Sequence, residues 1–265
     1  MGDPVAHSKS PRIHTLFAAQ TGQAIRYEAR RVPAGQLAGA LRAFRAEGGR
    51  GCNITVPLKE EAFRLADHPT GRVLQARAAN TLWFRDGIHA DNTDGIGLLR
   101  DLRQNLGWEV GGMRLLILGA GGAVRGILGP LLEQGPELVV IANRTVRRAR
   151  ELAGEFAACG PVDACGFEAL AGRRFDLVIN GTSASLGGEL PPLPEGLLAE
   201  GARCYDLMYA ARPTPFLAWA AQWGAATSDG LGMLVEQAAE SFCIWRGVRP
   251  DTAPVIALLR REMGG

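Results

Sequence analysis

A glycine-rich turn is the first group of residues whose spacing suggests chemistry. The short apolar run 115–118 is typical of a strand buried on both faces, and it leads into Gly119-Ala120-Gly121-Gly122-Ala123. Glycines at such a turn let a pyrophosphate approach the backbone N–H groups at a helix N-terminus. Val124 stands at the last position of the G-x-G-x-x-G pattern, so an ordinary strand–turn–helix unit is the alternative.

Arginines after the second apolar run, 138–142, indicate which dinucleotide the turn would bind. Asn143 lies 24 residues after Gly119 (143 − 119), where an NAD-binding chain carries Asp or Glu for the ribose 2′-OH. Here Asn143 is followed by Arg144, and Arg147 and Arg148 come close behind. Because an arginine fork suits a 2′-phosphate, the pattern predicts NADP(H) binding.

Lys59 and Asp94 are candidates for proton transfer. Lys59 falls in the first turn of a helix that Pro57 is expected to open, where the helix dipole disfavours a cation. A lysine that gives and takes a proton is what carbonyl reduction needs, although a solvated lysine beside two glutamates is the alternative. Asp94 ends the run Asp91-Asn92-Thr93-Asp94, which holds more polar side chains than one helix N-cap requires.

Two further pairs of polar residues could contact a ligand. Ser8 and Ser10 stand where Pro11 opens a helix; Ser10 is explained as its N-cap, whereas Ser8 is not. Two hydroxyls beside a helix N-terminus could hold a carboxylate. Asn53 and Thr55 alternate with apolar residues, so both project from one face of an expected strand, where exposure to solvent is the alternative.

The elements expected to position these residues change in kind near residue 113. Before it, the pattern predicts helices at 11–21, at 37–44, after Pro57 and at 95–106, a strand at 51–56, and a hairpin of 82–84 with 88–89. After it, strands are expected at 114–118, 138–142, 176–180, 203–207 and 225–227, with helices between them, as in a parallel, doubly wound sheet. Amphipathic helices are expected at 231–245 and 255–263.

Composition narrows the class of protein. The 265 residues are 47% hydrophobic with a formal net charge of +2, which excludes a disordered chain and gives no sign of a nucleic-acid or anionic-membrane partner. No apolar run is long enough to span a membrane, and no signal peptide is expected. The five cysteines show no C-x-x-C or Cys/His ligand spacing, so we expect reduced thiols in a cytoplasmic protein and no structural metal.

Motifs in order along nearly the whole chain resemble those of the shikimate dehydrogenase family. They are Gly2-Asp3-Pro4-Val5-Ala6-His7-Ser8-Lys9-Ser10-Pro11, Asn53-Ile54-Thr55-Val56-Pro57-Leu58-Lys59, Ala79-Asn80-Thr81-Leu82, Asp91-Asn92-Thr93-Asp94-Gly95, Gly119-Ala120-Gly121-Gly122-Ala123, Asn143-Arg144-Thr145, Asn180-Gly181-Thr182-Ser183, Tyr205-Asp206-Leu207-Met208-Tyr209, and Asp229-Gly230-Leu231-Gly232-Met233-Leu234 leading to Gln237-Ala238-Ala239. No single motif is decisive, but the ordered set is highly specific.

The resemblance implies an α/β enzyme with two domains. An N-terminal α/β substrate domain, 1–95, would be completed by C-terminal helices in 231–265, and 96–230 would form a Rossmann-like, doubly wound NADP domain. The implied reaction is reduction of 3-dehydroshikimate to shikimate in aromatic amino-acid biosynthesis, with hydride passing from NADPH to the C3 ketone. The partners would be this small molecule and a second copy in a homodimer, with neither nucleic acid nor membrane.

The resemblance also implies residue roles. Lys59 and Asp94 would be the catalytic pair, and Ser8 and Ser10 would hold the substrate carboxylate. Hydroxyls and ring of the substrate would be held by Asn53, Thr55, Asn80 and Gln237, with Tyr209 reaching towards it. NADP would be held by Gly119, Ala120, Gly121, Gly122, Ala123, Asn143, Arg144, Thr145 and Arg148, with Thr182, Met208 and Gly230 beside the nicotinamide.

Two departures from the family pattern and three alternatives accompany this interpretation. A strand usually precedes the Gly-Asx-Pro motif, whereas this chain starts at Met1, so we expect an incomplete edge in the sheet of the substrate domain; Thr15 also replaces a common Asn. The alternatives are a quinate/shikimate dehydrogenase of relaxed specificity, a non-catalytic NADP- or shikimate-binding protein, and a damaged reading frame. Arg144 argues against NAD preference, and retention of Lys59 and Asp94 argues against a non-catalytic protein.

Overall fold

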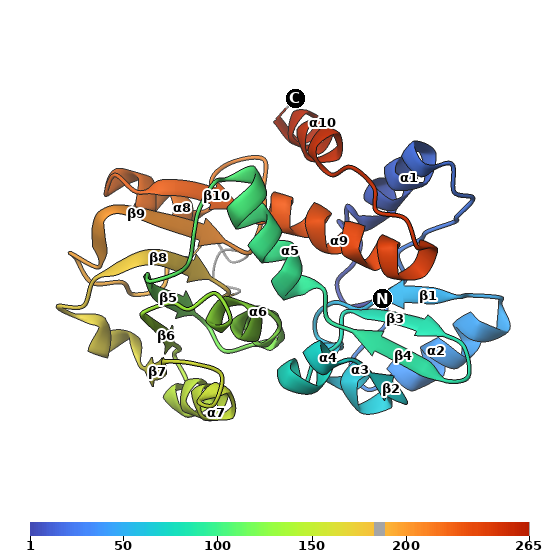
Figure 1. Cartoon of the computed structure of the whole chain (residues 1–265), viewed down its shortest axis with the longest axis horizontal. Helices are drawn as coiled ribbons and strands as arrows, with labels where there is room; N and C mark the ends of the chain where they lie inside the picture. The colour runs from blue at the N-terminus through green and yellow to red at the C-terminus, as the bar shows by residue number, and fades with distance from the viewer. Residues whose placement is uncertain (183–188, 265) are drawn as a thin grey trace.

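Two lobes, each built on its own β-sheet, make up the chain. The computed structural model describes residues 1–182 and 189–264. In Figure 1 the six-stranded sheet lies on the left and the four-stranded sheet on the right, with helices α5 (Asp94–Arg100) and α9 (Leu231–Arg246) between them. This mixed α/β architecture with a parallel sheet confirms the predicted fold class.

The smaller sheet belongs to the N-terminal lobe. Its order is β1 (Gly51–Asn53), β3 (Thr81–Phe84), β4 (Ile88–Asp91), β2 (His68–Pro69), with β3 and β4 forming the predicted antiparallel hairpin. Helices α2 (Leu37–Ala46), α3 (Lys59–Leu65) and α4 (Gly71–Ala76) contribute buried side chains to a core with Leu82 and Ala90 of the hairpin. The ends of β3 and β4 bring Asn80 and the Asp91–Asp94 run to the same edge.

Three local predictions in this lobe are wrong. The strand expected at 51–56 ends at Asn53, because the Thr55 N–H bonds to the Met1 carbonyl instead of to β3. The helix expected from Pro57 begins two residues later, at Lys59. Helix α1 (Ser10–Thr21) includes Ser10, so Lys9 occupies the N-cap position and the predicted cap at Ser10 does not form. Gly22 ends α1 with φ of 65°, as predicted.

The larger sheet is parallel throughout. Its order is β10 (Ala226–Asp229), β9 (Leu198–Asp206), β8 (Phe175–Asn180), β5 (Arg114–Leu118), β6 (Leu138–Ala142), β7 (Val162–Cys165). Alternate residues of each strand enter different cores: Leu115 and Ile117 pack with α5, α6 (Gly122–Leu132) and α7 (Val146–Phe156), while Leu116 and Leu118 pack with α8 (Pro215–Gln222). Helices therefore cover both faces, as in a doubly wound fold.

The strand β5 lies where the chain order of the large sheet reverses. Its neighbours are β6, the next strand in the chain, and β8, the third strand after it. In open α/β sheets ligands bind outside the carboxyl ends of the strands at such a switch point. The turn that follows Leu118 and the one that follows Asn180 meet there, because the Gly181 N–H donates to the Leu118 carbonyl.

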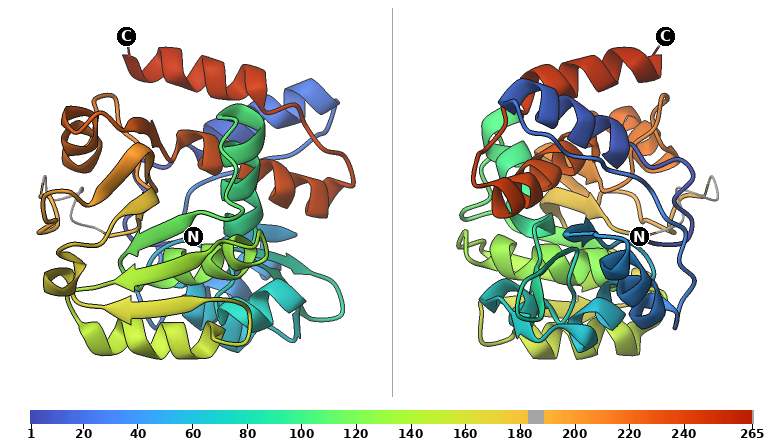
Figure 2. Two further views of the ribbon diagram at one scale, coloured as in Figure 1. Left: turned by 60° about the vertical axis from the view of Figure 1, so that its left-hand side comes forward. Right: turned by 90° about the vertical axis from the view of Figure 1, so that its right-hand side faces the viewer.

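The C-terminal helices return to the N-terminal lobe. Helices α1, α9 and α10 (Ala253–Gly264) share a core that contains Phe17, Phe242 and Leu259, and Figure 2 shows them together at the top of both views. The helix predicted at 95–106 is α5 followed by a π-helical turn at Asp101–Asn105. All five cysteines are free thiols. Within residues 1–182 and 189–264, no helix is both long and apolar enough to cross a membrane.

Candidate active site

Lys59 and Asp94 meet in a buried ion pair. Lys59 is the first residue of α3 and Asp94 is the first residue of α5. Lys59 Nζ lies 2.5 Å from Asp94 Oδ2, and the two side chains expose 11% and 7% of their surface. This burial excludes the alternative of a solvated lysine. The neighbouring Glu61 is used elsewhere, since its carboxylate accepts the backbone N–H of Leu37 at the start of α2.

Each residue of the Asp91–Asp94 run has a hydrogen-bond partner outside the run. Asp91 accepts a bidentate interaction from Arg72, at 2.9 and 2.6 Å. Asn92 donates its amide to a backbone carbonyl, and the Thr93 N–H donates to Asn80 Oδ1 at 2.9 Å. The run is therefore a scaffold that fixes the carboxylate at its end, and a helix cap alone does not account for it.

Asn80 and Gln237 extend the network around the ion pair. Asn80 Nδ2 donates to Asp94 Oδ1 at 2.8 Å and lies 3.3 Å from Gln237 Oε1. Gln237 comes from α9, and its own amide donates to the Leu234 carbonyl. Four residues far apart in the sequence, Lys59, Asn80, Asp94 and Gln237, thus form one hydrogen-bonded cluster.

The side-chain amide of Asn53 is held by hydrogen bonds to residues that the sequence pattern did not select. Its Oδ1 accepts the Tyr27 hydroxyl at 2.8 Å, and its Nδ2 lies 3.0 Å from Ser241 Oγ of α9. Tyr27 stacks on the fully buried His14, with ring centroids 4.2 Å apart. Burial lowers the pKa of His14 to about 3, so its ring is neutral. Nothing in the local sequence pattern could reveal this support, because it joins segments far apart in the chain.

Other residues expected to hold substrate lie at the start of α1 and beyond β1. Ser8 Oγ accepts the Ser10 N–H at 3.3 Å. Ser8 therefore has a structural role at the start of α1, which the sequence pattern did not predict. Thr55 is exposed, and it follows β1 instead of lying in it. Tyr209 is half-buried and packs beside the core of α1 and α9. Burial raises the pKa of its hydroxyl, while a hydrogen bond with the Lys9 backbone lowers that pKa by a smaller amount.

The glycine turn contains a backbone conformation and a close contact that favour glycine. Gly119 has φ of +103°, which L-residues with side chains rarely adopt, and a Cβ there would lie 3.1 Å from Gly181. Gly121 precedes α6 as its N-cap, and a Cβ on it would meet no atom within 4 Å. The space beside Gly121 is therefore open, next to the helix N-terminus at which an anion would bind.

Helix α6 also lies directly beside the ion pair. A Cβ on Gly122 would lie 3.8 Å from the Cβ of Lys59, and one on Gly126 would lie 3.0 Å from Asp94 Oδ2. A Cβ on Gly95 would lie 2.6 Å from the Gly126 carbonyl. Glycines at these contacts let α5 and α6 approach closely, which brings the expected catalytic pair next to the expected dinucleotide turn.

The arginines expected to choose the cofactor lie at the end of β6. Arg144 and Arg148 are exposed, and within residues 1–182 and 189–264 neither has an ion pair. Asn143 donates to the Thr145 carbonyl at 3.0 Å, which shapes the turn into α7. Arg147 instead pairs with Glu151 along the helix. Arg144 also lines a groove with Phe167 and the 192–194 loop, so its guanidinium is free to meet a phosphate.

Residues expected beside the nicotinamide are anchored at the ends of β8 and β9. Thr182 donates both its N–H and its hydroxyl to Asn180 Oδ1, whereas Ser183 of the same motif lies outside the described residues. The Gly230 N–H donates to the Met208 carbonyl. A Cβ on Gly230 would lie 2.4 Å from the Leu207 carbonyl, so this contact requires glycine.

The buried Asp206 orders the same turn; the sequence placed it in a motif but gave it no role. Its carboxylate accepts the Met208 N–H at 3.0 Å and the Thr214 hydroxyl at 2.6 Å. A buried carboxylate with such partners holds the backbone of Met208 in place. Because Asp206 stands among apolar residues in the sequence, no local pattern predicted that it holds the Met208 backbone.

A separate cavity of about 670 Å³ lies on the other side of Asn53. Segments 24–28 and 48–53 line it together with Trp83 and Trp245, and neither Lys59, Asp94 nor the glycine turn borders it. This cavity is thus not where the candidate chemical groups converge.

The arrangement combines a dinucleotide cradle with a proton donor. The N-terminus of α6 and the exposed Arg144 are the groups expected to hold the diphosphate and the 2′-phosphate of NADP, and Lys59 offers an ammonium next to that turn. Asp94 orients this ammonium, and Asn80 fixes the carboxylate. Such a set can protonate an oxygen that receives charge when a bound carbonyl is reduced.

Comparisons with known proteins agree with this geometry. Residues 1–82 match the family described as "Shikimate dehydrogenase substrate binding domain", 101–187 match "Shikimate / quinate 5-dehydrogenase", and 230–260 match "Shikimate 5'-dehydrogenase C-terminal domain". The shikimate dehydrogenase (NADP(+)) of Methylococcus capsulatus is 62% identical over 98% of this chain and 95% of its own. That of Alkalilimnicola ehrlichii is 60% identical over 99% of this chain and 97% of its own.

Solved structures give the same result. Shikimate 5-dehydrogenase of Thermus thermophilus, in complex with NADP(H) and shikimate, is 35% identical, with a TM-score of 0.87 over 98% of this chain and 97% of its own. A shikimate dehydrogenase in complex with NADP+ is 31% identical, with a TM-score of 0.88 over 99% of this chain and 93% of its own.

Proposed function

The chain belongs to the shikimate dehydrogenase family, and we propose that it catalyses the NADP-dependent interconversion of 3-dehydroshikimate and shikimate. The relatives above carry this activity in their names, which makes the chain an oxidoreductase of the same kind. The observation that supports the proposal most directly is the buried Lys59–Asp94 pair, which lies beside the glycine turn expected to hold the cofactor.

We propose that Lys59 is the proton donor of this reaction. NADPH, when bound, supplies the hydride that reaches the C3 ketone. Lys59 Nζ would donate its proton to the oxygen as negative charge develops there, and in the reverse direction would take it back. Asp94 would hold the ammonium through Oδ2 while Asn80 holds the other carboxylate oxygen; the 2.5 and 2.8 Å contacts support these roles.

The substrate would lie between the start of α1 and the Asn80–Gln237 cluster. Ser8 and Ser10 would bind the carboxylate, and Asn53, Thr55, Asn80 and Gln237 would bind hydroxyls and ring. Support comes from the anchoring of Asn53 by Tyr27 and of Asn80 by Asp94, since groups held in this way lose little freedom when a ligand binds. Tyr209 would reach the substrate from β9's end.

A turnover assay with two substrates and two cofactors tests the proposal. Purified protein would be given shikimate or quinate together with NADP or NAD, and formation of reduced nicotinamide would be followed by absorbance. We expect the highest kcat/KM with shikimate and NADP. Comparable kcat/KM for quinate would favour the enzyme of relaxed specificity, and binding of NADP without turnover of any pair would favour the non-catalytic protein.

Two finer hypotheses accompany this function. We propose a cytoplasmic enzyme, supported by five free thiols in a chain without disulfides. We also propose a homodimer, to be tested by light scattering during size exclusion; a mass near the 28.2 kDa of one chain at micromolar concentration would contradict it.

A further inference from the structure

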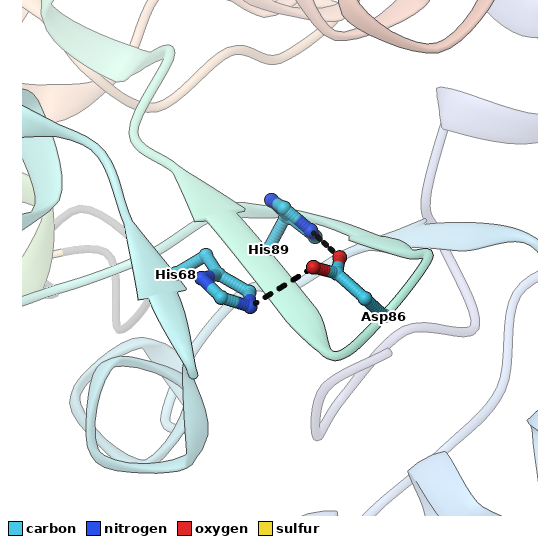
Figure 3. A group of neighbouring side chains, drawn as sticks. All are labelled: His68, Asp86 and His89. Carbon is cyan, nitrogen blue, oxygen red and sulfur yellow. Dashed lines mark hydrogen bonds and ion pairs between the residues drawn. The ribbon is translucent and has the colours of Figure 1, made fainter.

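Two histidines and an aspartate gather at the outer end of the β3–β4 hairpin, away from the Lys59–Asp94 pair. His68 of β2 and His89 of β4 are direct neighbours in the sheet register, and Asp86 lies in the turn that joins β3 to β4 (Figure 3). Asp86 Oδ1 lies 2.8 Å from His89 Nε2, and Asp86 Oδ2 lies 3.7 Å from His68 Nε2. Figure 3 shows both rings turned towards the carboxylate.

The spacing of these atoms is close to that of ligands around one metal ion. The three donor atoms all lie within 4.8 Å of one another. Nitrogen and oxygen ligands about 2.1 Å from a tetrahedral ion are roughly 3.4 Å apart, and the 2.8 and 3.7 Å separations, each to a different oxygen of Asp86, fall on either side of this value. Small rotations of side chains that are partly exposed would bring all three donors onto one ion.

The backbone that carries the three side chains is well supported. The rings of His68 and His89 stack with centroids 4.4 Å apart, and Trp83 stacks on the other side of His89 at 5.2 Å. Asp67 accepts the Ile88 N–H at 2.8 Å and thereby fixes the turn next to Asp86. Side chains that are already oriented lose less entropy when they bind an ion.

The side chains are also accessible to an ion. His68, Asp86 and His89 expose 47%, 74% and 21% of their side-chain surface. The donor set of two imidazoles and one carboxylate suits Zn²⁺, Co²⁺ or Ni²⁺, whereas Mg²⁺ and Ca²⁺ prefer oxygen ligands alone. Local sequence spacing could not reveal the group, because its members come from two strands and a turn.

We propose that His68, Asp86 and His89 bind one divalent transition-metal ion, which joins β2 to the β3–β4 turn. Each imidazole would use Nε2 and the carboxylate one oxygen, with water at the open positions. The bound ion would replace the present contacts of Asp86 with both histidines and would stabilise the outer edge of the small sheet. This site is independent of the proposed dehydrogenase activity.

Titration of tag-free, reduced protein with Co²⁺ and Zn²⁺ tests the site. We expect one ion per chain by calorimetry with Zn²⁺, and a Co²⁺ absorption spectrum without the intense near-ultraviolet band of thiolate ligands. His68→Ala and His89→Ala should each weaken binding at least as much as loss of an outer-shell partner, about 10–100-fold. His7→Ala, a histidine outside the group, should leave affinity and stoichiometry unchanged.

A thermal melt separates loss of the ligand from loss of the fold. Excess Zn²⁺ should raise the Tm of the unchanged protein and leave that of His68→Ala where it is, while both proteins turn over shikimate at the same rate without metal. A stoichiometry unaffected by either histidine change, a thiolate band with Co²⁺, or no saturable binding would overturn the proposal. None of these results would bear on the dehydrogenase activity, which the turnover assay measures separately.

Discussion

Replacing Lys59 by Met is the most direct test of the proposed proton transfer. Methionine keeps the length of the side chain and the Cβ that lies next to Gly122, but it cannot donate a proton. General acid–base groups contribute about 10²–10⁴-fold to turnover, which is roughly 2.7–5.5 kcal/mol of activation free energy. We therefore expect kcat to fall by about this factor, with a smaller change in the KM for shikimate.

The burial of the pair determines how the experiment must be controlled. Lys59→Met leaves the Asp94 carboxylate 7% exposed and without its cation, and loss of one partner of a buried ion pair costs about 3–5 kcal/mol of stability. Unfolding by urea must accompany the kinetics for that reason. Glu60→Gln is a matched control, because it changes an exposed charge on the adjacent residue of α3 and should leave kcat unaltered.

The double variant shows whether the two residues act together. Asp94→Asn should also lower kcat, because Lys59 would lose the carboxylate that orients it. Lys59→Met combined with Asp94→Asn should cost less activation free energy than the sum of the single changes, since residues that share one function are not additive. The chain has only two lysines, so NMR of labelled lysine side chains can follow the Lys59 signal directly in Asp94→Asn.

Cofactor binding provides the last control. Dissociation constants for NADP, measured by fluorescence, should stay within about threefold for all three variants, because neither Lys59 nor Asp94 lies in the glycine turn or at the end of β6. Near-normal kcat in Lys59→Met would refute the proposed role. Tyr209 would then be the next donor to test, since burial raises the pKa of its hydroxyl and keeps it protonated.

Three further outcomes follow from the structure. Arg144→Ala should raise the KM for NADP at least about tenfold and barely change that for NAD, because a charge-assisted hydrogen bond contributes about 1.5–3 kcal/mol. Arg147→Ala is the control, since the Arg147 guanidinium already pairs with Glu151. An equal rise of KM for both cofactors would contradict the assignment of Arg144 to the 2′-phosphate. Gly126→Ala should lower kcat, since the new Cβ would lie 3.0 Å from Asp94 Oδ2. The control is Gly154→Ala in α7, where a Cβ meets no atom within 4 Å. This change should leave kcat unaltered and stabilise the helix by up to about 1 kcal/mol. His14→Phe should make the free energy of unfolding less dependent on pH below 6.5, because the pKa of His14 is about 3 in the folded chain and near 6.5 in the unfolded chain. Between these values only the unfolded chain binds the proton, so the free energy of unfolding of the unchanged protein falls by up to about 1.4 kcal/mol per pH unit as the pH drops from 6.5 towards 3. Identical slopes against pH in urea titrations of both proteins would contradict this.

Strands buried on both faces were the most predictable elements. The sequence predicted β5 and β6 with their observed bounds, because a strand covered by helices on both sides is a continuous apolar run. The strand β7 was missed, since it lies at the edge of the sheet and contains the exposed Asp163. The Asp86-Gly87 turn likewise predicted the β3–β4 hairpin, whereas the two-residue β2 has no sequence signature.

The sequence predicted which residues belong to the candidate site, but not how they contact one another. Motifs identified Lys59, Asn80, Asp94 and Gln237, yet only the fold shows that they form one cluster. The support of Asn53 by Tyr27 escaped notice, because no local pattern links residues 26 positions apart. The roles of these residues and the domain division at 95/96 and 230/231 stay predictions.

The glycines of α6 explain why the two halves of the site come together. Glycine in a helix interior costs about 1 kcal/mol relative to alanine, so Gly126 and Gly129 weaken α6, of which Gly122 is the first residue. Each nevertheless faces the other lobe, since a Cβ would approach Lys59, Asp94 and Gln75 respectively. The helix whose N-terminus is expected to hold the cofactor thus gives up intrinsic stability at Gly126, where Asp94 lies beside it. A small residue at 126 is therefore as much a requirement of the proposed chemistry as the glycines of the turn.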